Sequence, residues 1–241
     1  MSLLEIEGIS KSFKGLKAVS SAAFEVPQGA IVALIGPNGA GKTTCFNMIA
    51  GVFAPDSGTI LFKNSPIQNL RPDQVCTAGI GRTFQIVKPF AGLSVLDNVI
   101  VGALLREGSV SSARVVSLSI LKKLKLDAKK DLPASSLTLP DRKRLEVARA
   151  LATRPRLLLL DEAMAGLRPT ECDEMVEVFR DLNRSDGLTI LLIEHVMRAV
   201  MALAQKVVVL HHGEIIARGT PAEVVRDAAV LECYLGEETE V

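Results

Sequence analysis

The chain has 241 residues, with 28 Lys and Arg against 27 Asp and Glu, and 48% of its residues are hydrophobic. At this length roughly 70% or more of the unfolded surface is buried on folding, so one compact domain with a subdomain needs no disulfide or metal to be stable. The formal net charge of +1 argues against a nucleic-acid partner, because such a partner requires an excess of basic residues on one face.

Three further features of the sequence argue against a secreted protein, a membrane-spanning protein and a protein held by disulfides or zinc. The first eight residues contain Glu5 and Glu7 and have no apolar stretch, so they are not expected to be a signal peptide. No apolar run reaches the roughly 20 residues of a membrane span, so any role at a membrane is expected to depend on a partner. The four cysteines form no C-x-x-C pair and are expected to be reduced and buried.

Short strands and a glycine-rich loop are expected in the first part of the chain. Residues 3–9 and 23–26 have strand character and are separated by a turn at Lys14-Gly15. The continuous apolar run 30–35 is typical of a strand buried on both faces. It leads into a glycine loop at 36–44, and the residues that follow can line one face of a helix.

Helices and strands alternate over the rest of the chain. A strand is expected at 59–62, and residues 95–153 are mostly helical in pattern, with interruptions at 108–112 and 131–140. Further strands are expected at 157–160, 189–193, 207–210 and 214–217. This alternation, with polar residues after the apolar strands, indicates an α/β fold with its site at the carboxyl edge of the sheet.

The glycine loop matches the phosphate-binding pattern G-x-x-x-x-G-K-[ST] without a mismatch. Glycines let backbone N–H groups wrap phosphates, and the helix N-terminus behind them favours anions. In this pattern Lys42 reaches the β- and γ-phosphates and the Thr43 hydroxyl coordinates Mg²⁺. ATP with Mg²⁺ is therefore the expected ligand. The expected nucleotide-binding residues of the loop are Gly36, Pro37, Asn38, Gly39, Ala40, Gly41, Lys42, Thr43 and Thr44.

Three further candidate residues follow apolar strands. Asp161 comes after four leucines, the setting of a carboxylate that holds Mg²⁺ through water. Glu162 is placed to orient and polarise an attacking water. His195 ends a later strand and can donate to the γ-phosphate, because sites in open α/β sheets collect at such ends. The alternative interpretation of Glu162 is a surface residue that opens a loop, and that of His195 is a structural histidine.

Together these motifs resemble the nucleotide-binding subunit of ABC transporters, from Leu3 to about Gly236. The resemblance implies an α/β P-loop NTPase (RecA-like) core with an N-terminal antiparallel β subdomain and an inserted helical subdomain. It implies one domain, 1–241, with the core at about 1–90 and 156–241 and the helical signature subdomain at about 91–155.

The resemblance also implies roles for residues outside the glycine loop. Thr83-Phe84-Gln85 is similar to the family's Q-loop, whose glutamine senses Mg²⁺ and water and links the ATP site to the transmembrane partner. His195 matches the switch histidine, and Phe13 falls where an aromatic ring stacks on adenine, with core packing as the alternative. The implied catalytic residues are Glu162, His195, Gln85 and Lys42, and the implied metal ligands are Thr43, Gln85 and Asp161.

Several stretches are similar to importers of the branched-chain amino acid type: GRTFQ at 81–85, LSVLDNV at 93–99, AGLRPTE at 165–171 and YLG at 234–236. The expected function is ATP hydrolysis coupled to import of branched-chain or related amino acids. A lipopolysaccharide-type export ATPase and a non-transport ABC regulatory protein are the alternatives. The implied partners are transmembrane permease subunits, a second nucleotide-binding subunit and, indirectly, an external solute-binding protein, at the cytoplasmic face of the membrane.

The signature motif departs from the family's usual Leu-Ser-Gly-Gly-Gln, because residues 137–141 read Leu-Thr-Leu-Pro-Asp. Thr138 still offers a hydroxyl to the nucleotide. Pro140 has no N–H to give a phosphate and suits the first position of a helix instead. Asp141 would repel a γ-phosphate. A distinct second subunit, with two unequal ATP sites, is therefore expected rather than a homodimer.

The chain departs from the family's pattern at two further positions, both after Glu162. Ala163 replaces the proline that usually follows the catalytic glutamate, and Arg168 stands where the family's D-loop often has Asp or Asn. These departures bear on communication through the D-loop more than on nucleotide binding.

The apolar segment 86–90 directly follows Gln85 and is expected to dock a short coupling helix of the permease. A loop folded onto its own domain is the alternative.

Overall fold

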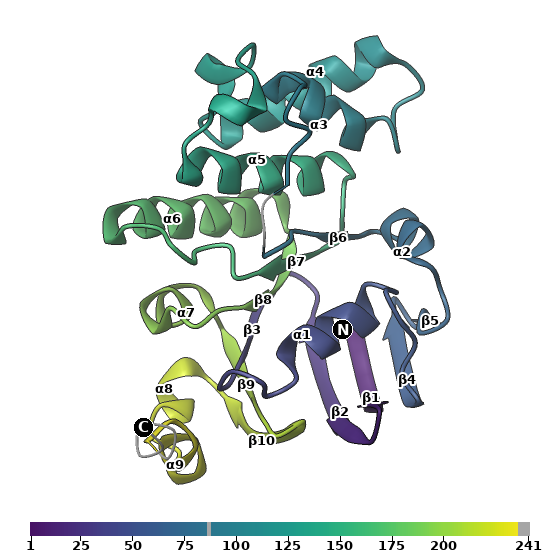
Figure 1. Cartoon of the computed structure of the whole chain (residues 1–241), viewed down its shortest axis with the longest axis vertical. Helices are drawn as coiled ribbons and strands as arrows, with labels where there is room; N and C mark the ends of the chain where they lie inside the picture. Colours follow the sequence, from purple (N-terminus) through teal and green to yellow (C-terminus); the bar gives the residue numbers. More distant parts are fainter. Residues whose placement is uncertain (86–87, 236–241) are drawn as a thin grey trace. The chain divides into compact units, whose positions relative to one another are not determined.

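The computed structural model describes residues 1–85 and 88–235. The chain forms two compact units, and the elements of each are labelled in Figure 1. The first unit contains Met1–Val75 and Thr189–Val241, and the second contains Cys76–Leu188. The helical segment expected at 91–155 lies inside the second unit.

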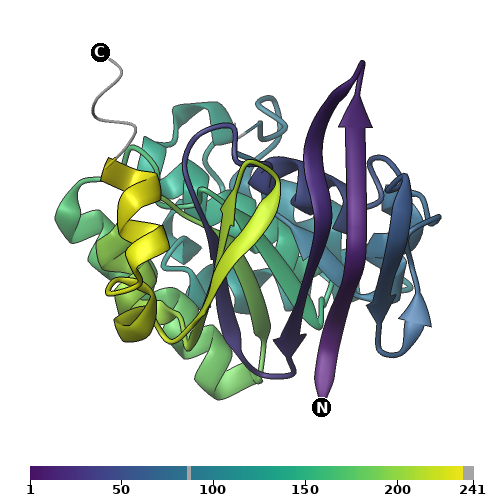
Figure 2. The same cartoon turned by 90° about the horizontal axis from the view of Figure 1, so that it is seen from below.

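An antiparallel sheet of four strands begins the first unit, in the order β2-β1-β4-β5. Its strands are β1 (Ser2–Phe13), β2 (Leu16–Pro27), β4 (Ser57–Phe62) and β5 (Ser65–Pro66). Lys14 and Gly15 connect β1 to β2 with φ angles of 46° and 90°, the left-handed pair that a tight hairpin requires. The expected strands are confirmed, and the hairpin extends well beyond them (Figure 2).

A second group of strands in the first unit carries the glycine loop. Strand β3 (Ile31–Ile35) pairs in parallel with β8 (Thr189–Ile193) and with β9 (Lys206–His211), and β10 (Glu214–Gly219) is antiparallel to β9. Every residue of β3 and β8 is buried, as their apolar runs predict. The accompanying helices are α1 (Lys42–Ile49), α7 (Met197–Leu203), α8 (Pro221–Val224) and α9 (Ala228–Leu235).

The second unit combines two parallel strands with helices. Its strands are β6 (Ile80–Arg82) and β7 (Leu157–Asp161), and its helices are α3 (Val95–Ala103), α4 (Val110–Lys123), α5 (Leu139–Ala152) and α6 (Pro169–Asp186). Two 3₁₀ turns, Asp127–Lys129 and Ala134–Ser136, separate α4 from α5, and helix α2 (Pro72–Ala78) contains the sequence boundary between the units.

Two predicted helix boundaries were wrong by a few residues. Helix α4 begins at Val110, inside the predicted break, because the Ser109 hydroxyl accepts the N–H of Ser112 and caps the helix. Helix α5 begins at Leu139, so Pro140 holds its second position and not its first.

The cysteines are all free thiols. Cys45, Cys172 and Cys233 are buried, as expected, whereas Cys76 is partly exposed. Burial raises the pKa of the Cys45 thiol to about 12. Among the described residues, no helix is both long and apolar enough to cross a membrane.

Removal of a buried side chain should unfold the protein more readily. Leu121 on α4 is fully buried, and Leu121→Ala should lower the free energy of unfolding by about 2–5 kcal/mol, because a cavity replaces its contacts. Leu132 in the same unit is 46% exposed, so Leu132→Ala is the control, with a loss below about 1 kcal/mol. Urea unfolding monitored by circular dichroism measures both, and equal losses would contradict this description of the core.

Candidate functional site

The glycine loop after β3 leaves no room for side chains at two of its glycines. Gly36 has a φ of 146°, and a Cβ there would lie 1.9 Å from the carbonyl oxygen of Leu210. Gly41 has a φ of 103°, and its Cβ would lie 2.3 Å from the carbonyl oxygen of Ala18. Both positions therefore require glycine, through the left-handed backbone and the close approach of a neighbouring strand.

Lys42 begins helix α1 and is buried with its amine turned back onto the loop. Its Nζ donates to the carbonyl oxygens of Gly36, at 2.7 Å, and Pro37, at 2.6 Å. The first turn of α1 contains no acidic residue, and its N–H groups have no earlier carbonyl of the helix to bond. The Thr43 side chain is exposed and Thr44 is half-buried. This arrangement is suited to an anion.

His195 lies at the same edge of the sheet as the glycine loop. Leu34 of β3 is paired with Ile193 of β8 in parallel register. Gly36 and His195 each stand two residues beyond that pair, at the carboxyl ends of neighbouring strands. His195 is exposed, so its imidazole is open to a ligand at this edge.

Phe13, at the end of β1, is 43% exposed and is not a core residue. Its ring meets that of Phe53 edge to face, with centroids 5.3 Å apart. The Lys11 amine lies 5.8 Å from the Phe13 ring and 5.6 Å from the Phe53 ring. Phe53 was not predicted, and no sequence signal marks it, because it reaches Phe13 only through the fold.

In the second unit, Asp161 ends β7 as a buried carboxylate. Arg82, from the neighbouring strand β6, donates to its Oδ2 at 2.9 Å. Asp161 Oδ1 is buried and accepts no hydrogen bond from the described residues. A buried carboxylate oxygen in this state is costly unless a further donor or a cation meets it. Arg82 was not predicted, although it directly precedes the Q-loop triplet in the sequence.

Glu162 and Gln85 meet in the second unit. The Gln85 side-chain amide donates to Glu162 Oε2 at 2.7 Å. Glu162 has a φ of 50°, a left-handed conformation that is uncommon for a residue with a side chain. The Lys143 amine, which was not predicted, donates to the Glu162 carbonyl oxygen at 2.8 Å. The backbone of Glu162 is thus held from helix α5 while its side chain contacts the Q-loop.

The altered signature segment folds around its own acid. The Thr138 hydroxyl donates to Asp141 Oδ2 at 2.8 Å, and the Lys129 amine donates to the same oxygen at 2.5 Å. Asp141 is buried, with an Arg144 guanidinium nitrogen 4.0 Å from its other oxygen. Burial opposes ionisation, but the hydrogen bonds from Lys129 and Thr138 outweigh it, so the pKa of Asp141 is lowered. The hydroxyl expected to reach the nucleotide is therefore engaged within its own segment.

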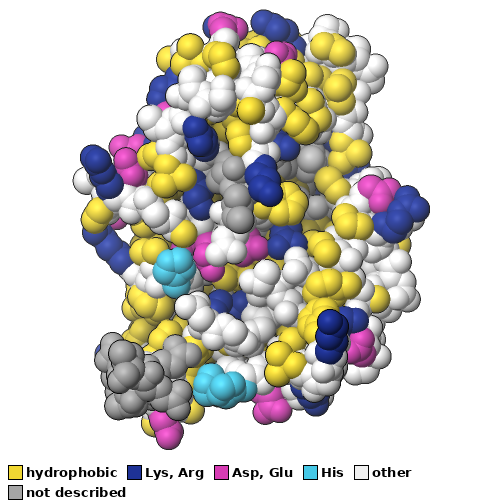
Figure 3. Space-filling model, viewed as in Figure 1, with side chains coloured by type: hydrophobic (Ala, Val, Ile, Leu, Met, Phe, Trp, Pro, Cys, Tyr) yellow, Lys and Arg dark blue, Asp and Glu magenta, His cyan; other side chains and the backbone are white. Residues whose placement is uncertain are grey.

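The expected docking segment is described only in part, because Ile86 and Val87 lie outside the described residues. Phe90 is 45% exposed, and the Arg149 guanidinium lies 4.8 Å from its ring centroid. Burial raises the pKa of the neighbouring Glu146 carboxyl despite its ion pair with Arg149. Hydrophobic side chains also gather on the surface of the helical part of this unit (Figure 3). The exposed large hydrophobic residues of this part of the chain include Leu93, Val101, Leu104 and Leu105, each 39–46% exposed.

The chain matches known proteins over nearly its whole length. The ABC transporter family matches residues 19–165, and a branched-chain amino acid ATP-binding cassette transporter family matches residues 214–240. The chain is similar to the high-affinity branched-chain amino acid transport ATP-binding protein LivG of Escherichia coli, with 37% identity over 98% of each chain. It is similar, at 34% identity over 99% of each chain, to the lipopolysaccharide export ATP-binding protein LptB of Acidithiobacillus ferridurans.

The fold is also found among solved structures. An ATP-binding cassette of an ABC transporter in its ADP conformation superposes with a TM-score of 0.89 and 32% identity, over 98% of this chain and 99% of that one. The chain therefore belongs to the ABC transporter family. Within that family it is an ATP-binding protein of the branched-chain amino acid transporter type, which confirms the predicted resemblance. The superposition on the solved cassette confirms the predicted fold class.

The contacts of Asp141 make stability depend on pH. Because its pKa is lowered in the folded protein, its charge stabilises the fold above the unfolded-state pKa, and this contribution is lost as pH falls through the folded-state pKa. Asp141→Asn should lower the free energy of unfolding by about 1 kcal/mol at pH 7, and the difference should vanish once the pH has fallen below the folded-state pKa of Asp141. Asp131→Asn, at an exposed acid, is the control in pH-dependent urea unfolding. A loss that is the same at every pH would contradict the role of the charge.

Proposed function

We propose that this chain is the ATP-hydrolysing subunit of an importer for branched-chain or related amino acids. The observation that carries the proposal is the glycine loop at the N-terminus of α1, with Lys42 folded onto the Gly36 and Pro37 carbonyls. The names of the relatives and the C-terminal family match support the class of solute. We also propose that the two units act together as one nucleotide-binding domain.

Lys42 and the backbone N–H groups of the loop bind the triphosphate in this proposal. The lysine amine exchanges its two loop carbonyls for β- and γ-phosphate oxygens, so its charge is held in place before ATP arrives. The exposed face of Phe13 stacks on the adenine. Asn38, Ala40 and Thr44 complete the loop around the phosphates.

Glu162 orients and polarises the attacking water, while His195 donates to the γ-phosphate. Gln85 fixes one oxygen of the Glu162 carboxylate, and the other oxygen accepts the hydrogen bond of the water. The hydrogen bond from Lys143 holds the Glu162 backbone in its left-handed conformation. Gln85 links this carboxylate to the docking segment that follows it in the chain.

The residues present fit a magnesium ion. Asp161 Oδ1 is a buried oxygen that accepts no hydrogen bond from described residues, and the Thr43 hydroxyl is exposed. Hydroxyl and carboxylate oxygens are the ligands that Mg²⁺ prefers, and it retains several waters. Thr43, Asp161 through water, and Gln85 would hold it. When bound, the ion neutralises charge on the phosphates.

Permease subunits, a second nucleotide-binding subunit and an external solute-binding protein are the proposed partners. Two exposed hydrophobic side chains, Phe84 in the Q-loop and Phe90 in the segment that follows it, support a protein contact there. Through the permease, the chain is held at the cytoplasmic face of the membrane.

The first test is ATP hydrolysis by the purified chain with Mg²⁺. Glu162→Gln keeps the shape of the side chain but cannot polarise water as a carboxylate does, so the rate should fall by about 100-fold or more while ATP still binds. Glu177→Gln, at an exposed position paired with Arg180, is the control and should leave the rate unchanged. A Glu162→Gln rate close to that of the native chain would contradict the assignment.

The second test concerns the partner subunit. We propose that the engaged Thr138 hydroxyl and the Pro140-Asp141 pair make this signature a poor phosphate site, so the chain works with a distinct second subunit. Pro140→Gly combined with Asp141→Gly should raise ATP hydrolysis by the isolated chain about tenfold or more, because an N–H replaces the proline and an acid is removed.

The matched control carries the same replacements nearby, Asp131→Gly with Pro133→Gly, and should not raise the rate. Hydrolysis by the isolated chain that already equals that of the complete transporter would rule out unequal sites.

A further inference from the structure

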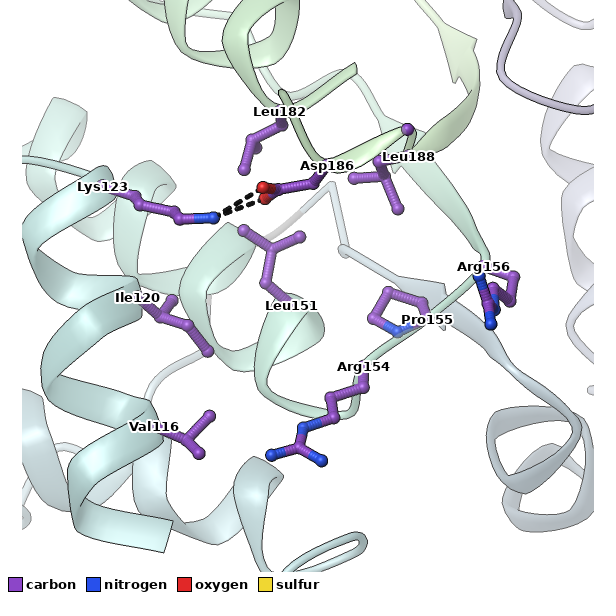
Figure 4. Close-up of a pocket in the computed structure, with 11 residues that line it drawn as sticks. Val116, Ile120, Lys123, Leu151, Arg154, Pro155, Arg156, Leu182, Asp186 and Leu188 are labelled. Atoms are coloured by element: carbon purple, nitrogen blue, oxygen red, sulfur yellow. Dashed lines mark hydrogen bonds and ion pairs between the residues drawn. The ribbon is translucent and has the colours of Figure 1, made fainter. Parts of the chain in front are cut away.

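A cavity of about 400 Å³ that is partly open to solvent lies within the second unit, and none of its lining residues belongs to the candidate site. It is formed by α4, by the C-terminal ends of α5 and α6, and by the residues that follow each of these two ends (Figure 4). Its apolar surface is aliphatic and comes from Val116, Ile120, Leu151, Leu182 and Leu188. Most small-ligand sites have this composition, an apolar lining with a few polar groups that fix orientation.

The charged residues of the cavity are mainly cations. Lys123 donates to both carboxylate oxygens of Asp186, at 2.7 and 2.6 Å, so these two charges neutralise each other. Arg154 pairs with Glu107, which is not part of the lining. Arg156 also lines the cavity. Its guanidinium pairs with no side chain among the described residues. Because Lys123 and Arg154 already have acidic partners, the charge with which the lining favours an anion is that of Arg156.

The backbone holds this site in place. Arg154 follows helix α5 in the left-handed conformation, with a φ of 52°, and Pro155 restricts the next position. In Figure 4 the Lys123–Asp186 ion pair and the Arg154 guanidinium lie on opposite sides of Leu151. A lining fixed in this way loses little conformational entropy when a ligand binds.

We propose that this cavity binds a small branched aliphatic carboxylate. The Arg156 guanidinium receives the carboxylate, and the branched alkyl group packs on Ile120, Leu151 and Leu182. Because guanidinium and carboxylate form paired, charge-assisted hydrogen bonds, a single unpaired arginine is sufficient to orient the ligand. The site is separate from the ATP-binding residues, and the proposal does not rest on the transport function.

The test is isothermal titration calorimetry of the full chain with 4-methylpentanoate, for which a Kd on the order of 1 mM is expected from the size of the ligand. Acetate lacks the alkyl group, 3-methylbutylamine carries the opposite charge, and leucine adds an ammonium group that the cationic lining disfavours. All three should bind at least about tenfold more weakly.

Two pairs of variants locate the site. Arg156→Gln should weaken 4-methylpentanoate binding about tenfold, whereas Arg114→Gln, on the exposed surface of α4, should leave it unchanged. Val116→Phe narrows the cavity and should weaken binding about tenfold, whereas Val115→Phe, at a residue that is 69% exposed, should leave binding unchanged. Circular dichroism confirms that each variant is folded.

Several results would overturn the proposal. They are the absence of binding heat with the native chain, binding of the amine or of leucine as tight as that of the carboxylate, and equal losses in the control variants. Because binding is the readout, failure here leaves the ATPase assignment untouched, and an inactive ATPase leaves this site intact.

Discussion

The glycine loop depends on the close approach of strand β9 to Gly36. The Leu210 carbonyl occupies the place where a side chain would begin, so the chain can turn out of β3 only with glycine at this point. That turn brings the Gly36 and Pro37 carbonyls to the amine of Lys42. The loop is thus shaped by a backbone contact within the sheet, and its charge is fixed by hydrogen bonds that a phosphate can replace.

A single pair of parallel strands organises the carboxylates of the second unit. Strands β6 and β7 run side by side, and Arg82 is paired in register with Leu159. The guanidinium therefore reaches Asp161, and Gln85, three residues farther on, reaches Glu162. Two adjacent acids thus take separate partners from one short segment: Asp161 is held buried, and Glu162 is held by an amide that carries no charge.

Much of the fold and of the candidate site could be predicted because short stretches of sequence determine it. Continuous apolar runs identify β3, β7 and β8, and the phosphate-binding motif identifies Lys42 and Thr43. The predicted start of α4 is too late because the Ser109 hydroxyl caps the helix ahead of Val110. Phe53 and Lys143 could not be predicted, since each acts on a residue far away in the sequence. The hydrogen bond between Thr138 and Asp141 is local in sequence. The hydrogen bond that Lys129 donates to the same oxygen comes from another segment and could not be predicted from local pattern.

The distribution of the cysteines has a practical consequence for spectroscopy. Three thiols are buried, and the pKa of Cys45, just behind the glycine loop, is raised to about 12, so at neutral pH it holds almost no reactive thiolate. Cys76 is partly exposed and is the first residue of the second unit. A maleimide dye should therefore label the native chain selectively at the covalent junction of its two units, and its fluorescence would report on motion there without any engineered cysteine.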